Sequence, residues 1–157
     1  MRPTADAVPE SLRTRLQRWG YNLHPTYRST GAWITYVAGD WREVRLRLPL
    51  AWRTRNVVGT IFGGSMYAAV DPIYMIMLIE NLGPGYVVWD KAASIRFRRP
   101  ARRALHARFR LGGEELAAIR AATAGGEPVD RTYTVELATA DGEVCAVVGK
   151  TIYVRER

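Results

Sequence analysis

The chain has 157 residues, of which 48% are apolar and 24% charged, a composition typical of one globular domain with a substantial core. Cys145 is the only cysteine, which excludes an intrachain disulfide and a thiolate metal cluster, and we expect neither a metal nor a resident cofactor. The formal net charge of +8 favours an anionic partner: nucleic acid, a membrane surface or a phosphorylated small molecule.

Neither the N-terminal segment nor the most apolar segment of the chain suggests a membrane protein. Residues 1–20 lack the apolar core of a secretory signal. The longest apolar run, 66–79, is interrupted by Asp71 and Pro72 and is too short and too polar to span a bilayer. We therefore expect a cytoplasmic protein that does not associate with membranes. No linker or repeat divides the chain, so we predict an N-terminal helix and lead-in over 1–30 and one domain over 31–157.

The first predicted elements are a helix and two strands. Residues 9–20 place Leu12, Leu16 and Trp19 at spacings of four and three, which predicts a short amphipathic helix. Over 32–48 the period changes to two, because apolar residues alternate with arginines towards the end of the segment. This alternation predicts strands with one solvated face.

The next segment is apolar on nearly every side. It opens with Gly63, Gly64 and Ser65, continues as MYAAVDPIYMIMLIEN, and ends before the Gly-Pro-Gly cluster at 83–85. A helix that is hydrophobic all round should be buried all round.

The second half of the chain predicts further strands, at 86–98, 105–111, 128–139 and 143–154, with a short Ala-rich helix at 114–124. The total is five or six antiparallel strands and one long buried helix. Curling the sheet around the helix covers both apolar surfaces at once. The predicted fold class is therefore α+β, a hotdog fold.

One stretch carries a specific motif. Residues 55–72, RNVVGTIFGGSMYAAVDP, resemble the loop and helix start of hotdog thioesterases related to the phenylacetate-pathway (PaaI-type) enzymes. Those enzymes carry Asn, then Gly-Thr, then His-Gly-Gly, then an Asp nine residues after the His. Asn56, the Gly-Thr pair 59–60, the Phe-Gly-Gly run 62–64 and Asp71 fall at the matching positions.

Two further segments extend the resemblance over residues 40–154. SIRFRRPA, residues 94–101, looks like the family's third core strand, which typically ends in an aromatic residue followed shortly by Pro-Ala. WDK at 89–91 and the helix at 114–124 are closer to an uncharacterised hotdog branch, similar to the C-terminal domain of the YiiD acetyltransferase-like proteins.

The resemblance implies hydrolysis of an acyl-CoA thioester at a subunit boundary, with coenzyme A as part of the substrate, in a dimer or a dimer of dimers. Such hydrolysis needs a polarised carbonyl and a carboxylate that acts as nucleophile or base. Unpaired N–H groups at Gly63 and Gly64 suit the first need, and Asp71 suits the second. Alternatively, the glycines permit a tight turn and Asp71 caps a helix that restarts at Pro72.

The other candidate residues come from the motif, from the strand that follows the long helix and from the arginine cluster after it. Asp90 lies where related enzymes have a small polar residue, or else forms a salt bridge with Lys91 or an arginine. The expected catalytic set is Asp71, Gly63, Gly64, Asp90 and Asn56. The expected substrate-binding set is Phe62, Tyr67, Arg96, Arg98 and Arg99.

Phe62 departs from the family pattern, because its ring replaces the usual His and cannot transfer a proton. This favours a second hypothesis, a non-catalytic binder of acyl thioesters or other apolar carboxylic ligands. The arginine cluster over 96–103 suits the phosphates of coenzyme A, or is a solvated strand face. Nucleic-acid binding is a remote third hypothesis that rests on charge alone, because the cluster lacks interleaved exposed aromatics.

Overall fold

In the computed structural model, which describes residues 8–157, the strands form one antiparallel six-stranded sheet in the order β1-β2-β4-β5-β6-β3. The strands are β1 (Trp33–Val37), β2 (Glu43–Leu48), β3 (Tyr86–Phe97), β4 (Leu105–Arg110), β5 (Val129–Ala138) and β6 (Val144–Glu156). The helices are α1 (Leu12–Leu23), α2 (Pro25–Arg28), α3 (Gly63–Val70), α4 (Ile73–Leu82) and α5 (Gly113–Thr123). The first seven residues of the predicted N-terminal lead-in lie outside the described residues.

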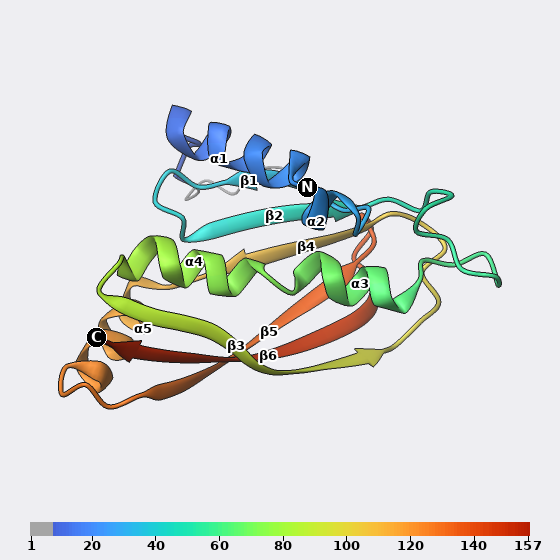
Figure 1. Ribbon diagram of the computed structural model, residues 1–157. Coiled ribbons are helices and arrows are strands. Elements are labelled where there is room, and N and C mark those ends of the chain that lie inside the picture. Colours follow the sequence, from blue (N-terminus) through green and yellow to red (C-terminus); the bar gives the residue numbers. More distant parts are fainter. Residues whose placement is uncertain (1–7) are drawn as a thin grey trace.

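The sheet curls around α3 and α4, which follow one another along its inner face (Figure 1). The predicted hotdog fold is thus confirmed, with the buried helix interrupted at Asp71 and Pro72. The interruption has a local cause. Pro72 has no N–H to donate to the preceding turn, and its ring would clash with a carbonyl group of that turn in a regular helix. No helix in the described part of the chain is both long and apolar enough to cross a membrane.

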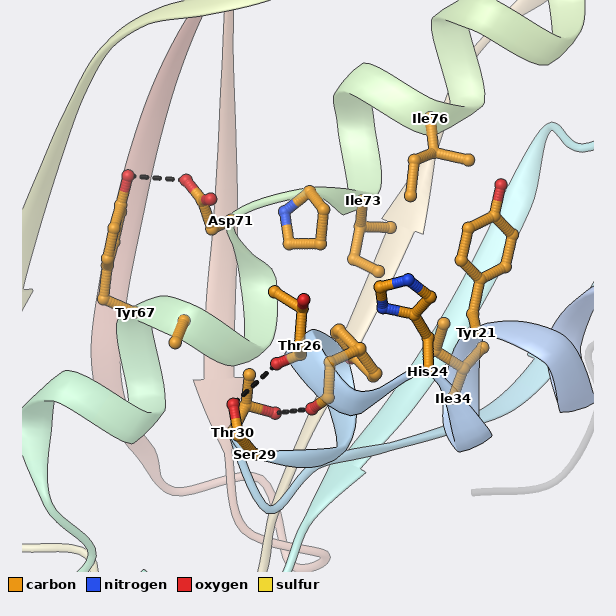
Figure 2. A pocket seen from close by; sticks show the side chains of 13 residues that line it. Tyr21, His24, Thr26, Ser29, Thr30, Ile34, Tyr67, Asp71, Ile73 and Ile76 are labelled. Carbon is orange, nitrogen blue, oxygen red and sulfur yellow. Dashed lines mark hydrogen bonds between the residues drawn. The ribbon is translucent and has the colours of Figure 1, made fainter.

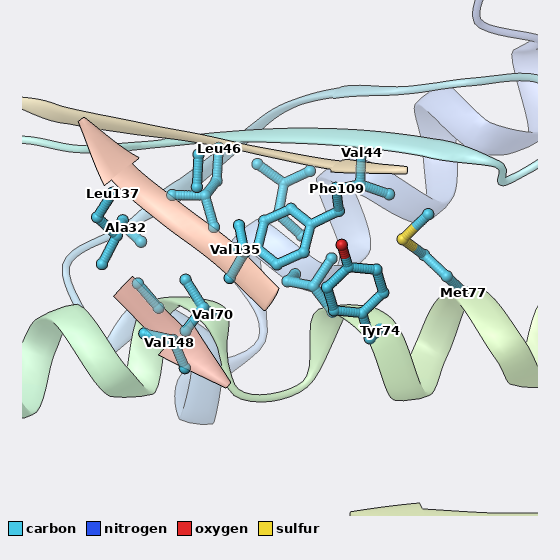
Figure 3. Packing of buried hydrophobic residues seen from close by; sticks show 14 of the residues in the cluster. Ala32, Val44, Leu46, Val70, Tyr74, Met77, Phe109, Val135, Leu137 and Val148 are labelled. Carbon is cyan, nitrogen blue, oxygen red and sulfur yellow. The ribbon is translucent and has the colours of Figure 1, made fainter. Parts of the chain in front are cut away.

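The core lies between this helix pair and the sheet. Val70, Tyr74 and Met77 on the helices face side chains of the sheet, among them Phe109 (Figure 3). Tyr74 contacts the Phe109 ring edge-on, with ring centroids 5.2 Å apart. The side chains that β4 and β5 turn towards the helices alternate with more exposed ones, as period two predicted. In β2 the predicted solvated face is largely absent, because Glu43 and Arg45 are buried there as an ion pair.

The two edges of the sheet differ. At the β1 edge, the side chain of Asn22 in α1 bonds to both backbone groups of Ile34: Nδ2 donates to the carbonyl at 2.9 Å, and Oδ1 accepts from the N–H at 2.8 Å. Glu10 accepts a further bond there from the N–H of Val37. The β1 edge is therefore sealed by side chains. At the other edge β3 pairs only with β6, and residues 91–94 of β3 are exposed.

Candidate active site

Asp71 ends α3, and its carboxylate turns away from the helix that follows. Its backbone is still helical, with φ −47° and ψ −54°, and its N–H donates to the carbonyl of Tyr67. No side chain caps α4, whose first turn begins after Pro72, so Asp71 does not serve as a helix cap. Its Oδ1 instead accepts a hydrogen bond from the Tyr67 hydroxyl at 2.6 Å.

Lys150 is the centre of the site, and the sequence motif did not single it out. It lies on β6 with only 1% of its side chain exposed. Its Nζ donates to Oδ1 of Asp71 at 2.6 Å and forms an ion pair with Oδ1 of Asp90, on the adjacent β3, at 2.9 Å. The Tyr67 hydroxyl is 3.5 Å from the same nitrogen. We call Tyr67, Asp71, Asp90 and Lys150 the acid cluster.

A signal for Lys150 was present in the sequence. Along β6 the side chains of Val148, Lys150 and Ile152 share the buried face, where period two predicts apolar residues only. A charged group at such a position is costly unless it is paired, so a lysine there predicts carboxylates opposite it. The alternative interpretation of Asp90 was a salt bridge with Lys91 or an arginine; in the structure its partner is Lys150, and Lys91 pairs with Asp130 at 2.6 Å.

The surroundings drive the pKa values of the two carboxyls in opposite directions. Burial raises the pKa of Asp71, but hydrogen bonds from Lys150 and Tyr67 outweigh it and hold the net pKa below its usual value. For Asp90 burial is the stronger effect, and with the charge of Asp71 it raises the pKa despite the attraction of Lys150. Asp71 is therefore the ionised member of the pair, and Asp90 is the one that holds a proton more readily.

An apolar pocket of about 520 Å³ lies beside Asp71, between α2 and the interruption of the helix pair. Figure 2 shows Ile73, Ile76 and Tyr21 along one side of it, with Tyr67 and Asp71 at the other. Its volume falls within the range of small-molecule sites, about 300–1,000 Å³. One oxygen of Asp71 is engaged by Tyr67 and Lys150, whereas its second oxygen has no hydrogen-bond partner among residues 8–157.

The two glycines lie at the far end of α3. Phe62 precedes the helix and offers no side-chain cap, so the first-turn N–H groups keep their capacity to donate. Aromatic rings lie close over both positions: a Cβ on Gly63 would come within 2.7 Å of the Phe97 ring, and one on Gly64 within 2.3 Å of the Phe62 ring. A side chain at either position would therefore have to displace one of these two exposed rings.

A second cavity, of about 470 Å³, adjoins this end and is lined by Asn56, Gly63, Arg98 and Arg99. The Asn56 amide is engaged within its own loop, since Oδ1 accepts from two backbone N–H groups and Nδ2 donates to Thr60. Asn56 thus shapes the loop beside the glycines. Two expected substrate-binding arginines line the cavity, whereas the third, Arg96, is exposed on β3 and not among its lining residues.

The structure therefore sorts the predicted residues into two groups. Tyr67, Asp71 and Asp90 meet at Lys150, and the glycines lie with Asn56 at the other end of α3. A helix rises about 1.5 Å per residue, so Gly63 and Asp71 are separated by roughly 12 Å along its axis. Among residues 8–157, no group of three or more His, Cys, Asp or Glu side chains is gathered as a metal site would require.

The fold of the chain is similar to those of several solved structures. The chain is similar to the PA5026 protein of Pseudomonas aeruginosa, described as a probable thioesterase, with a TM-score of 0.81 and 20% identity over 96% of this chain and 99% of that one. It is similar to the HI1161 thioesterase of Haemophilus influenzae, with a TM-score of 0.68 and 16% identity over 95% and 94% of the two chains.

A third structure, a point mutant of the PA1618 thioesterase of Pseudomonas aeruginosa, gives a TM-score of 0.68 and 14% identity over 90% and 94% of the two chains. These neighbours have the hotdog fold, as the sequence motif predicted. No curated protein matches the chain in sequence. The profile of one family, "Domain of unknown function (DUF4442)", matches residues 13–154. Because that match spans nearly the whole domain, the chain belongs to the DUF4442 family.

Proposed function

We propose that the protein is an acyl-CoA thioesterase, and that each of its sites is completed by a second copy of the chain. The observation that carries the proposal is the buried ammonium of Lys150, which holds Asp71 ionised beside an apolar pocket. An ionised carboxylate next to a space for an acyl group is what thioester hydrolysis requires. The thioesterases among the structural neighbours support the same chemistry.

In the proposed reaction the free oxygen of Asp71 attacks the thioester carbonyl carbon, or removes a proton from a water that attacks it. The carbon–sulfur bond breaks, and coenzyme A leaves as a thiolate that takes up a proton. If Asp71 is the nucleophile, water then cleaves the acyl–aspartate anhydride and regenerates the carboxylate. In either route water supplies the oxygen and the protons, so the products are a free acid and coenzyme A. Asp90, with its raised pKa, is the group suited to hold a proton during this exchange.

The distance along α3 supports a site that is shared between two chains. A carbonyl oxygen must lie about 3 Å from its N–H donors while the carbonyl carbon lies about 3–3.5 Å from the attacking oxygen. The separation of roughly 12 Å between Gly63 and Asp71 exceeds that reach. The acid cluster and the glycines of one chain therefore serve two different substrates.

Antiparallel pairing of two open β3 edges would bring the glycines of one chain to the acid cluster of the other. Asp90 lies near the start of β3, and Phe97, whose ring covers Gly63, lies at its end. In an antiparallel pair the start of one strand lies beside the end of the other. Each acid cluster would then face the partner's glycines, with Arg98 and Arg99 available for the phosphates of coenzyme A.

The decisive experiment is acyl-CoA hydrolysis by wild type and by Asp71→Asn. We expect Asp71→Asn to lower kcat by at least about a hundred-fold, since the amide keeps the shape of the side chain but cannot act as base or nucleophile. Acyl-CoA affinity, measured by calorimetry, should change little. The exposed Asp130→Asn is the matched control, and its rate should equal that of wild type. Unchanged turnover in Asp71→Asn would refute the catalytic role of this carboxylate.

A second candidate function is a non-catalytic binder of acyl thioesters or other apolar carboxylic ligands. It is favoured by Phe62, which is 56% exposed at the position where related enzymes carry a histidine. A binder would retain acyl-CoA without releasing free thiol. If wild type binds acyl-CoA but does not hydrolyse it, and Phe62→His does not introduce turnover, the binder replaces the enzyme as the proposed function.

A further inference from the structure

Helix α1 is amphipathic in the opposite sense to most surface helices. Four large apolar side chains recur along it at spacings of four, three and four: Leu12, Leu16, Trp19 and Leu23. All four are exposed, by 72%, 64%, 48% and 57% respectively. An amphipathic helix normally turns its apolar side to the core. Here the side turned to the domain carries the buried polar residues Thr14 and Asn22.

Specific hydrogen bonds fix this orientation. Asn22 holds the edge of β1 through two bonds to Ile34, as described above. On the preceding turns, Gln17 accepts from the indole of Trp41 at 3.0 Å, and Arg18 pairs with Glu10 at 2.7 Å. Rotating α1 to bury its leucines would break every one of these contacts. The exposed apolar side is therefore built into the fold.

The apolar surface continues from the helix onto the neighbouring strand. Trp33 of β1 is 42% exposed, and its ring meets that of Trp19 edge-on with centroids 6.3 Å apart. We define the outer apolar face as Leu12, Leu16, Trp19, Leu23 and Trp33. Tryptophan is enriched where proteins meet the headgroup region of a bilayer.

Positive charge surrounds this face. At about 100° per residue, Arg13 and Arg15 project on the two sides of the apolar stripe. Arg13 also pairs with Glu80, while Arg47 lies directly across the strand pair from Trp33 and is exposed. The sequence has no acidic residue between Glu10 and Asp40. An apolar strip with a cationic rim complements an anionic interface that is apolar beneath its charged groups.

We propose that the outer apolar face binds the surface of an anionic lipid bilayer, with α1 lying in the plane of the headgroups. The proposal does not rest on the thioesterase reaction, and it departs from the sequence-based expectation of a protein without membrane association. Figure 1 shows α1 on the side of the molecule away from β3. Pairing through β3 therefore leaves the face uncovered.

A second copy of the chain is the other candidate occupant, and charge disfavours it. Two copies meeting here would bring Arg15 and Arg47 of both chains together, and the acidic residues nearby, Glu80 and Glu10, already pair with Arg13 and Arg18. A bilayer needs only the apolar side of the helix and supplies the anions.

The test is co-sedimentation of the full chain with vesicles of phosphatidylcholine, alone or mixed with phosphatidylglycerol. We expect binding to the mixed vesicles, with a blue shift of tryptophan emission as Trp19 and Trp33 leave water. Added salt should weaken this binding because it screens the arginines. Leu16→Glu should reduce binding by about ten-fold or more, since it places a charge in the middle of the apolar strip.

The matched control is Val57→Glu, which places the same charge at another exposed apolar position, in the loop before α3. It should bind vesicles as wild type does. Both positions are exposed, so both variants should keep the wild-type thermal midpoint. Equal binding by wild type and Leu16→Glu, or equal binding to vesicles without phosphatidylglycerol, would overturn the proposal. The proposal would also be overturned if wild type does not bind vesicles but self-associates, and Leu16→Glu abolishes that self-association.

Discussion

Lys150 supplies the positive charge that allows two carboxylates to approach one point. Its Nζ is 2.6 Å from Asp71 and 2.9 Å from Asp90, so the cluster carries a net charge of about −1 when both are ionised. A buried ammonium costs several kcal/mol in lost hydration, which two carboxylates and the Tyr67 hydroxyl together offset. Without the lysine, the same carboxylates would repel one another.

Replacing this lysine should move the pH dependence of catalysis. In Lys150→Met the length of the side chain is kept and the charge is removed, so burial and the neighbouring Asp90 both raise the pKa of Asp71. A base is active only when deprotonated. The acid limb of kcat/KM against pH should therefore shift to higher pH.

The control for this experiment is Lys91→Met, because Lys91 is exposed and pairs with Asp130 away from the cluster. It should leave the pH profile in place. A Lys150→Met profile that falls in height but keeps its acid limb would contradict the electrostatic role and leave only a structural one.

At the scale of elements, α4 has one enclosed side and one side that borders the pocket. Leu78 is fully buried, whereas Ile76 lines the 520 Å³ pocket. Leu78→Ala should lower the free energy of unfolding by about 2–5 kcal/mol, because it empties a closed site. Ile76→Ala should cost clearly less, since its space is already open. Urea unfolding of both variants measures the difference, and equal losses would argue against an open pocket.

Period and composition predicted most of these elements. The sequence of β4 alternates because one face of the strand contacts the helix pair, so its period records its burial. The same alternation in β2 predicted a solvated face, but Glu43 and Arg45 are buried there because they form an ion pair. The long helix was predicted because it is apolar on nearly every side, but burial on all sides was not borne out: one side of α4 borders the pocket, and Ile79 is 43% exposed. The outward direction of the α1 stripe was not predicted, because a helical period identifies an apolar side but does not say whether the fold supplies a partner for it.

The candidate site was predicted in part. Asp71 was predicted from its spacing in the motif, Asp90 from the resemblance of its strand to related enzymes, and Tyr67 as a substrate-binding residue; the structure brings the three together. Lys150 was missed because the motif is local, whereas β6 reaches Asp71 across 79 positions of sequence. The separation between Asp71 and Gly63 could not be predicted from the sequence either, because it depends on α3 running as one uninterrupted helix between them.

For the whole molecule, a site shared between chains makes a prediction about mixtures. Asp71→Asn removes the carboxylate, and Gly63→Pro removes one N–H donor and crowds the Phe97 ring. The extended conformation of Phe62, with φ −63° and ψ 132°, tolerates a proline after it. Each variant alone should be inactive. After joint unfolding and refolding, half of the pairs are mixed and each has one intact site, so about a quarter of wild-type activity should return.

Sites contained within single chains would give a different result. Each chain in the mixture would still carry one defect, and activity would stay at the level of the separate variants. Circular dichroism of each variant alone checks that both fold. Sedimentation of the same mixture should show dimers or larger even-numbered species at micromolar concentration. A well-folded monomer that retains full activity would contradict pairing through β3.

The amide of Asn22 bears on how many chains could join edge to edge into one sheet. Pairing two chains through β3 uses the one open edge of each and leaves β1 at both outer ends. There the groups of Ile34 that would recruit another strand are already bonded to Asn22. In a pair of the proposed kind, these bonds oppose the addition of a third chain at β1. We therefore expect the sheet to end at two chains and not to propagate into a fibre.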